Sequence, residues 1–337
     1  MKKDNLIFSV VVCTYNGETK IGKAIDSVLS QNFPKSKYEV IVVDDGSSDN
    51  TANIAKKYPV KFIKHSKNRQ LSGARNTGLK NSKGQIYVCF DDDCFADKNW
   101  LSNIYSVYQT KDNIAGVGGK IITVKNPSLL DSYLYESNYM NPNPSSNYSY
   151  SPASRLFNYL KVTLVGRDKT RTIYQTNDLA GGNSSFPVEI LRSVGGWSDE
   201  YSGIEDIELC RRIKNKYPEK KYFVTKKALI THDPKLTLRR FLKTQLKRSN
   251  ATYLYFKRYN TLPPIFPFPI AFIVLSLISL FISPLTFLAT LLISPQIMYF
   301  SWLIKSLKKR QLIHLLFPYI QLIYESTFIV GILKSAI

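Results

Sequence analysis

Three consecutive carboxylates, Asp91, Asp92 and Asp93, directly follow the apolar run Ile86–Phe90. A short run of this kind predicts a buried strand of a parallel sheet, and open α/β sheets bind ligands at the carboxyl ends of their strands. Acids this close repel one another unless a cation or a hydrogen-bonded ligand neutralises them. A hard divalent metal that also holds substrate phosphates is the simplest such partner. The alternative is an acidic turn that caps the next helix.

Two more acid pairs occur along the chain. Asp44 and Asp45 follow the apolar run Val40–Val43, and Glu205 and Asp206 directly precede a predicted helix. Each pair alone fits a helix cap, which is the commoner use of such residues. Together they predict one site with three tasks: recognising a nucleoside, holding a metal against a diphosphate, and acting as a base.

The elements that must position these acids alternate between strands and helices. Strands are expected at Leu6–Thr14, Val40–Val43, Val60–Lys64 and Ile86–Phe90, and helices after Gly17, at Thr51–Lys57 and at Ala74–Asn81. This alternation predicts an α/β domain in which helices cover both faces of a parallel sheet. The glycine fingerprint of dinucleotide-binding proteins is missing, because Gly116–Gly119 precedes an apolar run rather than a helix. A dehydrogenase is therefore disfavoured.

Composition narrows the class of partner. The chain has 46 Lys and Arg against 25 Asp and Glu, a formal net charge of +21, which suits nucleic acid, acidic lipid or a phosphorylated substrate. The four cysteines have no metal-ligand spacing and are interpreted as reduced core thiols of a cytosolic domain; they are Cys13, Cys89, Cys94 and Cys210. A soft ligand role for Cys94 is disfavoured because oxygen ligands lie beside it. The N-terminus does not have the pattern of a signal peptide.

The C-terminal third predicts membrane association. No charged residue occurs from Thr261 to Ile304, and about 20 apolar residues span a bilayer core. Pro284 favours a hairpin of two helices over residues 265–304, and the basic cluster Lys305–Arg310 after it is expected on the cytoplasmic side. The apolar stretch 312–333 is either a third span or an interfacial helix.

The segment between the first domain and this membrane region is basic and amphipathic. Residues 235–262 carry eight Lys and Arg and no acid, so a helix that grips anionic lipid head groups is expected. A solvated charged helix is the alternative. No nucleic-acid recognition motif is present, which disfavours nucleic acid as the partner. The expected organisation is a catalytic domain at 1–234, the basic helix at 235–262 and the membrane region at 263–337.

Several short motifs occur in the order found in one known family. Over residues 6–250 the chain resembles the family-2 inverting glycosyltransferases of the GT-A fold, a Rossmann-like architecture. The matching stretches are Val11–Gly17, Val42–Ser47, Leu71–Asn76, the Asp91–Asp93 triad as the DxD element, Gly181-Gly182-Asn183, Gly195-Gly196-Trp197, Gly203–Asp206 and the late His232. Any one of these motifs is weak evidence, whereas the ordered set is specific.

The resemblance implies a nucleotide-sugar donor, linked to UDP or GDP, and a divalent metal. Asp45 would accept the imino proton of uracil or its equivalent, and Arg75 would lie near the base or the diphosphate. The resemblance also assigns Thr14, Tyr15, Asn16 and Asp44 to the nucleoside pocket. Asp91 and Asp92 would approach ribose and metal, while Asp91, Asp93 and His232 would form the site for Mg²⁺ or Mn²⁺.

The resemblance also implies the catalytic and acceptor residues. Asp206 would act as the general base, and Glu205 would hold the acceptor or support the base. Gly182 and Asn183 would form the floor beneath the sugars, and Trp197 would either stack on a sugar or belong to the core. Gln245 and Arg248 have the spacing used by processive members, but Ser249 stands where those enzymes carry Trp. This departure argues against a processive synthase and leaves Arg248 to bind diphosphate or lipid phosphate.

These expectations predict a membrane-anchored enzyme that moves one sugar to a lipid-linked glycan on the cytoplasmic face of the cell membrane. The region 126–175 is expected to face the acceptor. A polyprenyl-phosphate sugar synthase is one alternative, although its ionised acceptor would need no general base. A catalytically inactive nucleotide-sugar-binding membrane module is the other.

Overall fold

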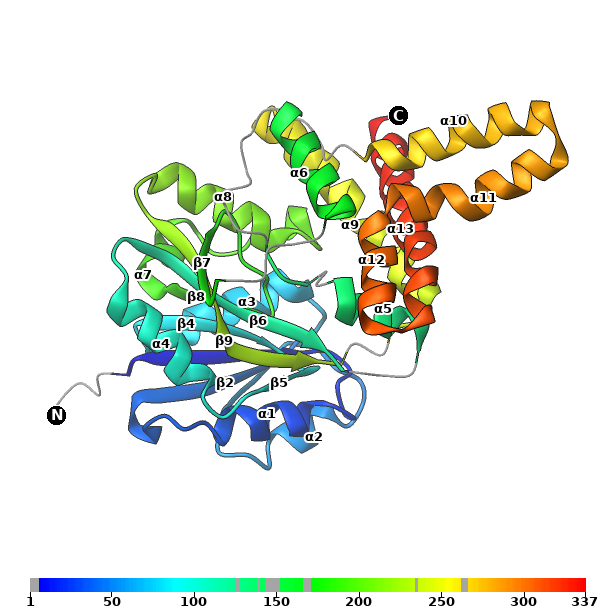
Figure 1. Ribbon diagram of the computed structural model, residues 1–337. Helices are drawn as coiled ribbons and strands as arrows, with labels where there is room; N and C mark the ends of the chain where they lie inside the picture. The colour runs from blue at the N-terminus through cyan, green and yellow to red at the C-terminus, as the bar shows by residue number, and fades with distance from the viewer. Residues whose placement is uncertain are drawn as a thin grey trace. The chain divides into compact units, whose positions relative to one another are not determined.

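The structure is a computed structural model that describes residues 6–124, 128–137, 140–142, 152–165, 171–233, 236–261 and 266–337 (Figure 1). The chain folds as two compact units. The first, here called the sheet unit, comprises Met1–Lys125, Asn138–Ser146 and Thr172–Lys235. The second, here called the helical unit, comprises Asn126–Ser137, Asn147–Arg171 and Leu236–Ile337.

The sheet unit is built on one mixed sheet with the strand order β3-β2-β1-β4-β8-β6-β9-β5, and β7 pairs with β9 outside this path. Pairing is parallel within β3-β2-β1-β4 and between β6 and β9, whereas β8 is antiparallel to both β4 and β6. The strands are β1 Phe8–Thr14, β2 Tyr38–Asp44, β3 Lys61–Lys64, β4 Ile86–Asp91, β5 Cys94–Ala96, β6 Ile114–Thr123, β7 Ile173–Thr176, β8 Asn183–Pro187 and β9 Lys221–His232.

Strand register gathers the acidic clusters at one edge of the sheet. Every residue of β1 is buried, as expected for a central strand flanked by two parallel neighbours. Thr14 pairs with Asp44 on one side, and Cys13 pairs with Asp91 on the other. The carboxyl ends of β2, β1 and β4 therefore meet, which confirms the α/β expectation for this half of the sheet.

Helices cover both faces of this sheet. On one face, buried residues of α1 (Ile21–Leu29), α2 (Thr51–Ala55) and α4 (Trp100–Thr110) pack on Phe8, Val10 and Val12. On the other face, α3 (Gln70–Asn81), α7 (Val188–Ser193) and α8 (Glu205–Lys216) pack on Val11 and Cys13. Alternation of side chains along β1 divides the core into these two layers. Two 3₁₀ helices, Lys35–Lys37 and Asp199–Tyr201, complete the described elements of this unit.

The helical unit contains the remaining helices. They are α5 Leu129–Ser137, α6 Pro152–Leu164, α9 Leu238–Tyr259, α10 Pro267–Ile282, α11 Pro284–Met298, α12 Phe300–Lys309, the 3₁₀ helix Leu312–Leu316 and α13 Phe317–Ala336. The hairpin predicted over residues 265–304 is shorter than expected, because α11 ends at Met298 and the chain bends by 78° into α12. Among the described residues, Leu312–Ala336 is the one helical stretch whose length and composition would allow it to cross a membrane unbroken.

The region 126–175 also differs from its prediction. It was expected to lie within the first domain, yet α5 and α6 belong to the helical unit. Residues 125–127, 138–139, 143–151 and 166–170 lie outside the described residues. The prediction that this region faces the acceptor therefore stays a prediction.

Candidate active site

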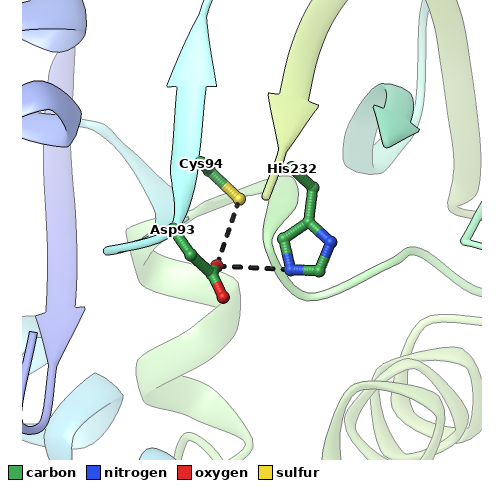
Figure 2. Close-up of side chains that lie close together, drawn as sticks. All are labelled: Asp93, Cys94 and His232. Carbon is green, nitrogen blue, oxygen red and sulfur yellow. Dashed lines mark hydrogen bonds and ion pairs between the residues drawn. The ribbon is translucent and has the colours of Figure 1, made fainter. Parts of the chain in front are cut away.

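The acidic triad lies in a turn between two strands. Asp91 ends β4, and Cys94 begins β5 and pairs with His232 at the end of β9. This pairing places the imidazole of His232 beside Asp93, although the two residues are far apart in the chain (Figure 2). The short strand β5 is thus what joins the DxD element to the late histidine.

Asp93 and His232 form a close pair. Oδ1 of Asp93 lies 3.2 Å from Nε2 of His232, and Oδ2 lies 3.6 Å from Nζ of Lys20. Although burial acts in the opposite direction, the His232 hydrogen bond holds the pKa of Asp93 below its usual value. Burial lowers the pKa of His232, but the hydrogen bond and the charge of Asp93 act in the other direction. The net effect is a pKa above the usual value of an imidazole.

The donor set around this pair fits a hard divalent cation. Ligand atoms of Asp93, Cys94 and His232 all lie within 4.8 Å of one another. Within the described part of the chain, Nδ1 of His232 and Oδ1 of Asp91 are buried without a hydrogen-bond partner. Burial raises the pKa of the Cys94 thiol well above its usual value, which makes its sulfur a weaker candidate than the carboxylate oxygens beside it. Carboxylates and one imidazole remain, which suit Mg²⁺ or Mn²⁺.

A buried arginine connects the triad to the second acid pair. Arg75 on α3 is 2% exposed, and its Nη1 lies 2.7 Å from Oδ1 of Asp206 and 3.2 Å from Oε1 of Glu205. Its Nη2 lies 3.5 Å from Oδ1 of Asp91. One guanidinium therefore balances three carboxylates from two elements, β4 and α8. Its predicted position near the base or the diphosphate stays a prediction.

Asp206 has the electrostatics of a base that works near neutral pH. Burial raises its pKa to about 7, against the opposing effect of Arg75, and Glu205 adds to the rise. The indole Nε1 of Trp197 also donates to Oδ1 of Asp206 at 3.2 Å. A carboxylate held by two donors and poised near pH 7 can accept a proton from a hydroxyl group.

Asp45, the predicted base-reading acid, is fixed by two donors. Oδ1 of Asp45 lies 2.7 Å from Nδ1 of His65 and accepts from the backbone N–H of Arg69 at 2.8 Å. Nε2 of His65 in turn lies 2.8 Å from Oγ1 of Thr77. This chain of contacts orients the carboxylate at the end of β2.

The neighbouring Asp44 has a different environment. It is fully buried, its Oδ1 accepts from the N–H of Ser47 at 2.8 Å, and Nζ of Lys64 lies 3.7 Å from its Oδ2. These contacts fix the turn after β2. No part of its side chain reaches the surface, and its assignment to the nucleoside pocket stays a prediction.

Asp92 is held by Thr14, the last residue of β1. Oγ1 of Thr14 donates to Oδ2 of Asp92 at 2.6 Å, and burial raises the pKa of Asp92 to about 6 despite this hydrogen bond. Tyr15 is 52% exposed, which leaves its ring available for stacking. Asn16 has a positive φ of 51°, and its Oδ1 accepts from the N–H of Ser48. The side chain of Asn16 thus connects the loop after β1 to the loop after β2.

Two predicted acceptor residues belong to the core. The amide of Asn183 is fully buried and bonded to Nε1 of Trp100 and to two backbone carbonyls. Trp197 is 3% exposed and packs on Tyr87 and Phe186. Because Trp197 is almost fully buried, the structure favours the core alternative for it, and the acceptor role of Asn183 stays a prediction.

The glycines of the same motif do approach the site. A Cβ on Gly182 would lie 2.7 Å from Oδ2 of Asp91, and a Cβ on Gly181 would lie 2.0 Å from Oδ2 of Asp206. Only glycine leaves room for both carboxylates in their present positions. Gln245 and Arg248 lie on α9 of the helical unit, and their acceptor roles stay predictions.

Sequence reasoning missed two residues of this site, His65 and Lys20. Their contacts with Asp45 and Asp93 come from side chains that no motif singles out. A weak signal exists for both, because each follows a strand whose end lies at the acidic edge. His65 comes directly after β3, and Lys20 lies in the loop after β1.

With this geometry in place, sequence comparison identifies a domain of a known family in part of the chain. Residues 9–166 match the family described as Glycosyl transferase family 2. The chain contains a family 2 glycosyltransferase domain. The matched segment includes Arg75 and the acidic triad and ends before Glu205, Asp206 and His232, and the roles of all these residues stay predictions.

Proteins of similar sequence are named as glycosyltransferases. The chain is 39% identical over 98 residues to glycosyltransferase AglE of Haloferax volcanii, which covers 28% of this chain and 32% of AglE. It is 28% identical over 228 residues to the poly(ribitol-phosphate) β-N-acetylglucosaminyltransferase TarP of Staphylococcus aureus, which covers 64% of this chain and 69% of TarP. The chain thus spans about a third of the first relative and about two thirds of the second.

A solved structure supports the fold of the glycosyltransferase domain. The mannosyltransferase PcManGT of Pyrobaculum calidifontis, in complex with GDP-Man and Mn²⁺, aligns with a TM-score of 0.59 at 17% identity. The alignment covers 98% of this chain and 87% of PcManGT. At this identity the likeness establishes the fold, which is the GT-A fold expected from the sequence.

Proposed function

We propose that the chain transfers a single sugar from a UDP- or GDP-linked donor to a hydroxyl group of a lipid-linked glycan, with inversion at the anomeric carbon. The observation that carries this proposal is the position of Arg75. It contacts Asp206, the proposed base, and Asp91, an acid of the metal and donor site. One side chain would therefore connect the proposed donor site to the proposed base.

Asp93 and His232 would hold Mg²⁺ or Mn²⁺, with Asp91 beside them. When bound, the cation would neutralise charge on the departing nucleoside diphosphate. Asp45, oriented by His65, would read the nucleobase through a hydrogen bond to its imino group, and Thr14 would hold Asp92 beside the nucleoside. The PcManGT complex with GDP-Man and Mn²⁺ supports this choice of ligands.

Asp206 would remove the proton of the acceptor hydroxyl as that oxygen attacks the anomeric carbon. A single in-line displacement inverts the anomeric centre, so an α-linked donor gives a β-linked product. The name of TarP, which describes a β-N-acetylglucosaminyl transfer, supports this stereochemistry. A polyprenyl-phosphate acceptor is already ionised and would leave Asp206 without a task, which favours a hydroxyl acceptor.

Membrane attachment on the cytoplasmic side completes the proposal. The exposed basic residues Arg239, Lys243 and Lys247 of α9 and the cluster Lys305–Arg310 suit anionic head groups. Attachment would keep the enzyme beside an acceptor that is itself anchored in the bilayer.

A donor screen on purified full-length protein in detergent tests the proposal. With Mn²⁺ present, one UDP- or GDP-sugar should be consumed faster when a lipid-linked saccharide is added than when a polyprenyl monophosphate is added, and a chelator should stop the reaction. Donor consumption that is insensitive to the chelator, or that prefers the monophosphate, would contradict it. Flotation of the chain with anionic vesicles tests the attachment separately.

A further inference from the structure

The hairpin of α10 and α11 exposes an apolar surface at its tip and along both helices. Phe281 is 88% exposed, Ile282 69% and Leu285 76%. The two helices lie side by side and extend beyond α12 and α13 within the helical unit (Figure 1). No charged residue occurs between Thr261 and Ile304. A contiguous apolar surface of this kind in water marks an interaction site, and its composition fits hydrocarbon.

The turn at the tip satisfies its own polar groups. Ser283 and Thr286 form reciprocal bonds, with the N–H of Thr286 donating to Oγ of Ser283 and the N–H of Ser283 donating to Oγ1 of Thr286, both at 3.1 Å. Oγ1 of Thr286 also donates to the carbonyl of Ser279 at 2.9 Å, and Pro284 has no N–H to satisfy. Backbone in hydrocarbon must be satisfied internally, so this turn is built to remain in lipid.

Both helices of the hairpin are too short to cross a bilayer. α10 has 16 residues and α11 has 15, which correspond to lengths of about 24 and 22 Å, whereas the hydrocarbon core is about 30 Å thick. After α11 the chain bends by 78° into α12, which ends in the exposed Lys308 and Lys309. A spanning helix would continue through the hydrocarbon at this point. The chain instead turns toward the lipid head groups.

The other apolar helix, α13, packs against a charged helix. The rings of Phe241 on α9 and Tyr324 on α13 have centroids 6.0 Å apart, and a Cβ on Gly331 would lie 1.7 Å from Oγ of Ser249. The two helices thus run side by side past Tyr324, near the middle of α13. The same part of α9 carries the exposed Lys243 and Lys247. Charged residues in the hydrocarbon core are costly, so α13 cannot cross the bilayer while it keeps this neighbour.

A buried carboxylate at the middle of α13 supports the same conclusion. Glu325 is 2% exposed and accepts hydrogen bonds from Tyr159 on α6 at 2.6 Å and from Tyr299 at 2.8 Å. Gln321 donates to the other carboxylate oxygen at 3.0 Å. Polar contacts to other elements at this depth are typical of the core of a folded unit. One face of α13 therefore packs inside the helical unit through polar as well as apolar contacts.

We propose that the protein is monotopic: the α10–α11 hairpin enters the hydrocarbon from one face and returns to it, and no described helix crosses the bilayer. This inference rests on the membrane attachment proposed above, and it replaces the expected two or three spans. The tip at Ile282 lies in the acyl chains, and the C-terminus lies on the same face as the sheet unit. The partner of the hairpin surface is the acyl region of one leaflet.

Cysteine labelling of the full-length chain in sealed membrane vesicles tests this topology. The four native cysteines are buried, which keeps the background low. Lys57→Cys marks the face of the sheet unit, Ile282→Cys marks the tip and Ala336→Cys marks the C-terminus; all three positions are exposed. A membrane-impermeant maleimide is applied to vesicles of each orientation, and detergent is then added.

The monotopic arrangement predicts that Ala336→Cys is labelled in the same vesicles as Lys57→Cys, and that Ile282→Cys loses labelling in both orientations and regains it in detergent. Labelling of Ile282→Cys or Ala336→Cys only in vesicles that protect Lys57→Cys would overturn the proposal, because it would place that position on the opposite face. Labelling of Ile282→Cys together with Lys57→Cys would mean that the hairpin does not enter the bilayer. A chain absent from the vesicle fraction would refute the attachment itself, while the donor screen would still test sugar transfer.

Discussion

Arg75 and Asp206 form the closest ion pair between α3 and α8, with Nη1 of Arg75 2.7 Å from Oδ1 of Asp206. The same guanidinium reaches Asp91 at the end of β4. Because Arg75 is almost fully buried, its charge has to be balanced by these acids rather than by solvent. The pair therefore couples the packing of the sheet unit to the chemistry of its site.

Replacing Asp206 by Asn should abolish sugar transfer and leave donor binding intact. Loss of a general base costs a factor of about 10² to 10⁴ in rate, so kcat should fall by at least two orders of magnitude. The exposed Asp199→Asn in the neighbouring 3₁₀ helix is the matched control and should keep its activity. Calorimetric titration with the nucleoside diphosphate checks donor binding. Transfer at the normal rate by the Asp206 variant would show that another group takes the proton.

The pH dependence of transfer should report the raised pKa of Asp206. A base acts in its ionised form, and the folded protein holds this carboxyl protonated below about pH 7. Activity should therefore rise with pH through about 7, and kcat/KM for the acceptor should fall about tenfold for each pH unit below it. The profile is measured at saturating donor. An acidic limb near pH 4, the range of an ordinary carboxyl, would argue against this role.

Replacing Arg75 by Gln should lower both the stability of the fold and the rate of sugar transfer. The change leaves Asp91, Glu205 and Asp206 without their shared cation, and breaking a buried ion pair in this way costs about 3–5 kcal/mol. Thermal melting in detergent should show a clearly lower Tm. Arg69→Gln, at an exposed position six residues before Arg75, should change stability by less than about 0.5 kcal/mol. Equal melting of both variants would mean that the acids do not depend on Arg75.

The adjacent glycines Gly181 and Gly182 should give distinct defects when changed to Ala. A Cβ on Gly182 displaces Asp91, which should weaken Mn²⁺ and donor binding. A Cβ on Gly181 displaces Asp206 and should lower kcat with less effect on donor affinity. Each variant serves as the control for the other. Identical defects in both kinetic parameters would indicate general disruption of the loop.

The strand ends of this site could be predicted from the sequence, and the contacts across it could not. The fully apolar runs before Asp44 and Asp91 predict buried parallel strands. Because the carboxyl ends of parallel strands lie at the same edge of a sheet, the two acids are expected to lie near each other. The pairing of β5 with β9 depends on a strand of three residues, which no periodicity reveals. The burial of Asn183 and the contact of His65 with Asp45 depend on side-chain packing that sequence pattern does not specify.

The membrane region illustrates a similar limit. The length of the apolar stretches predicted membrane spans and located the hairpin. Hydropathy, however, does not indicate which neighbours a helix packs against. The close approach of Gly331 to Ser249 and the buried Glu325 decide the environment of α13. Both depend on tertiary contacts between α6, α9 and α13.

Metal binding at Asp93 and His232 tests the central claim most directly. Crystals of the protein soaked with Mn²⁺ and UDP or GDP should give one strong manganese anomalous peak, with Oδ of Asp93 and a ring nitrogen of His232 within about 2.3 Å. The His232→Gln variant should weaken or lose this peak, while the nucleoside diphosphate remains near Asp45. Nucleotide bound with no manganese between its phosphates and these two residues would contradict the account.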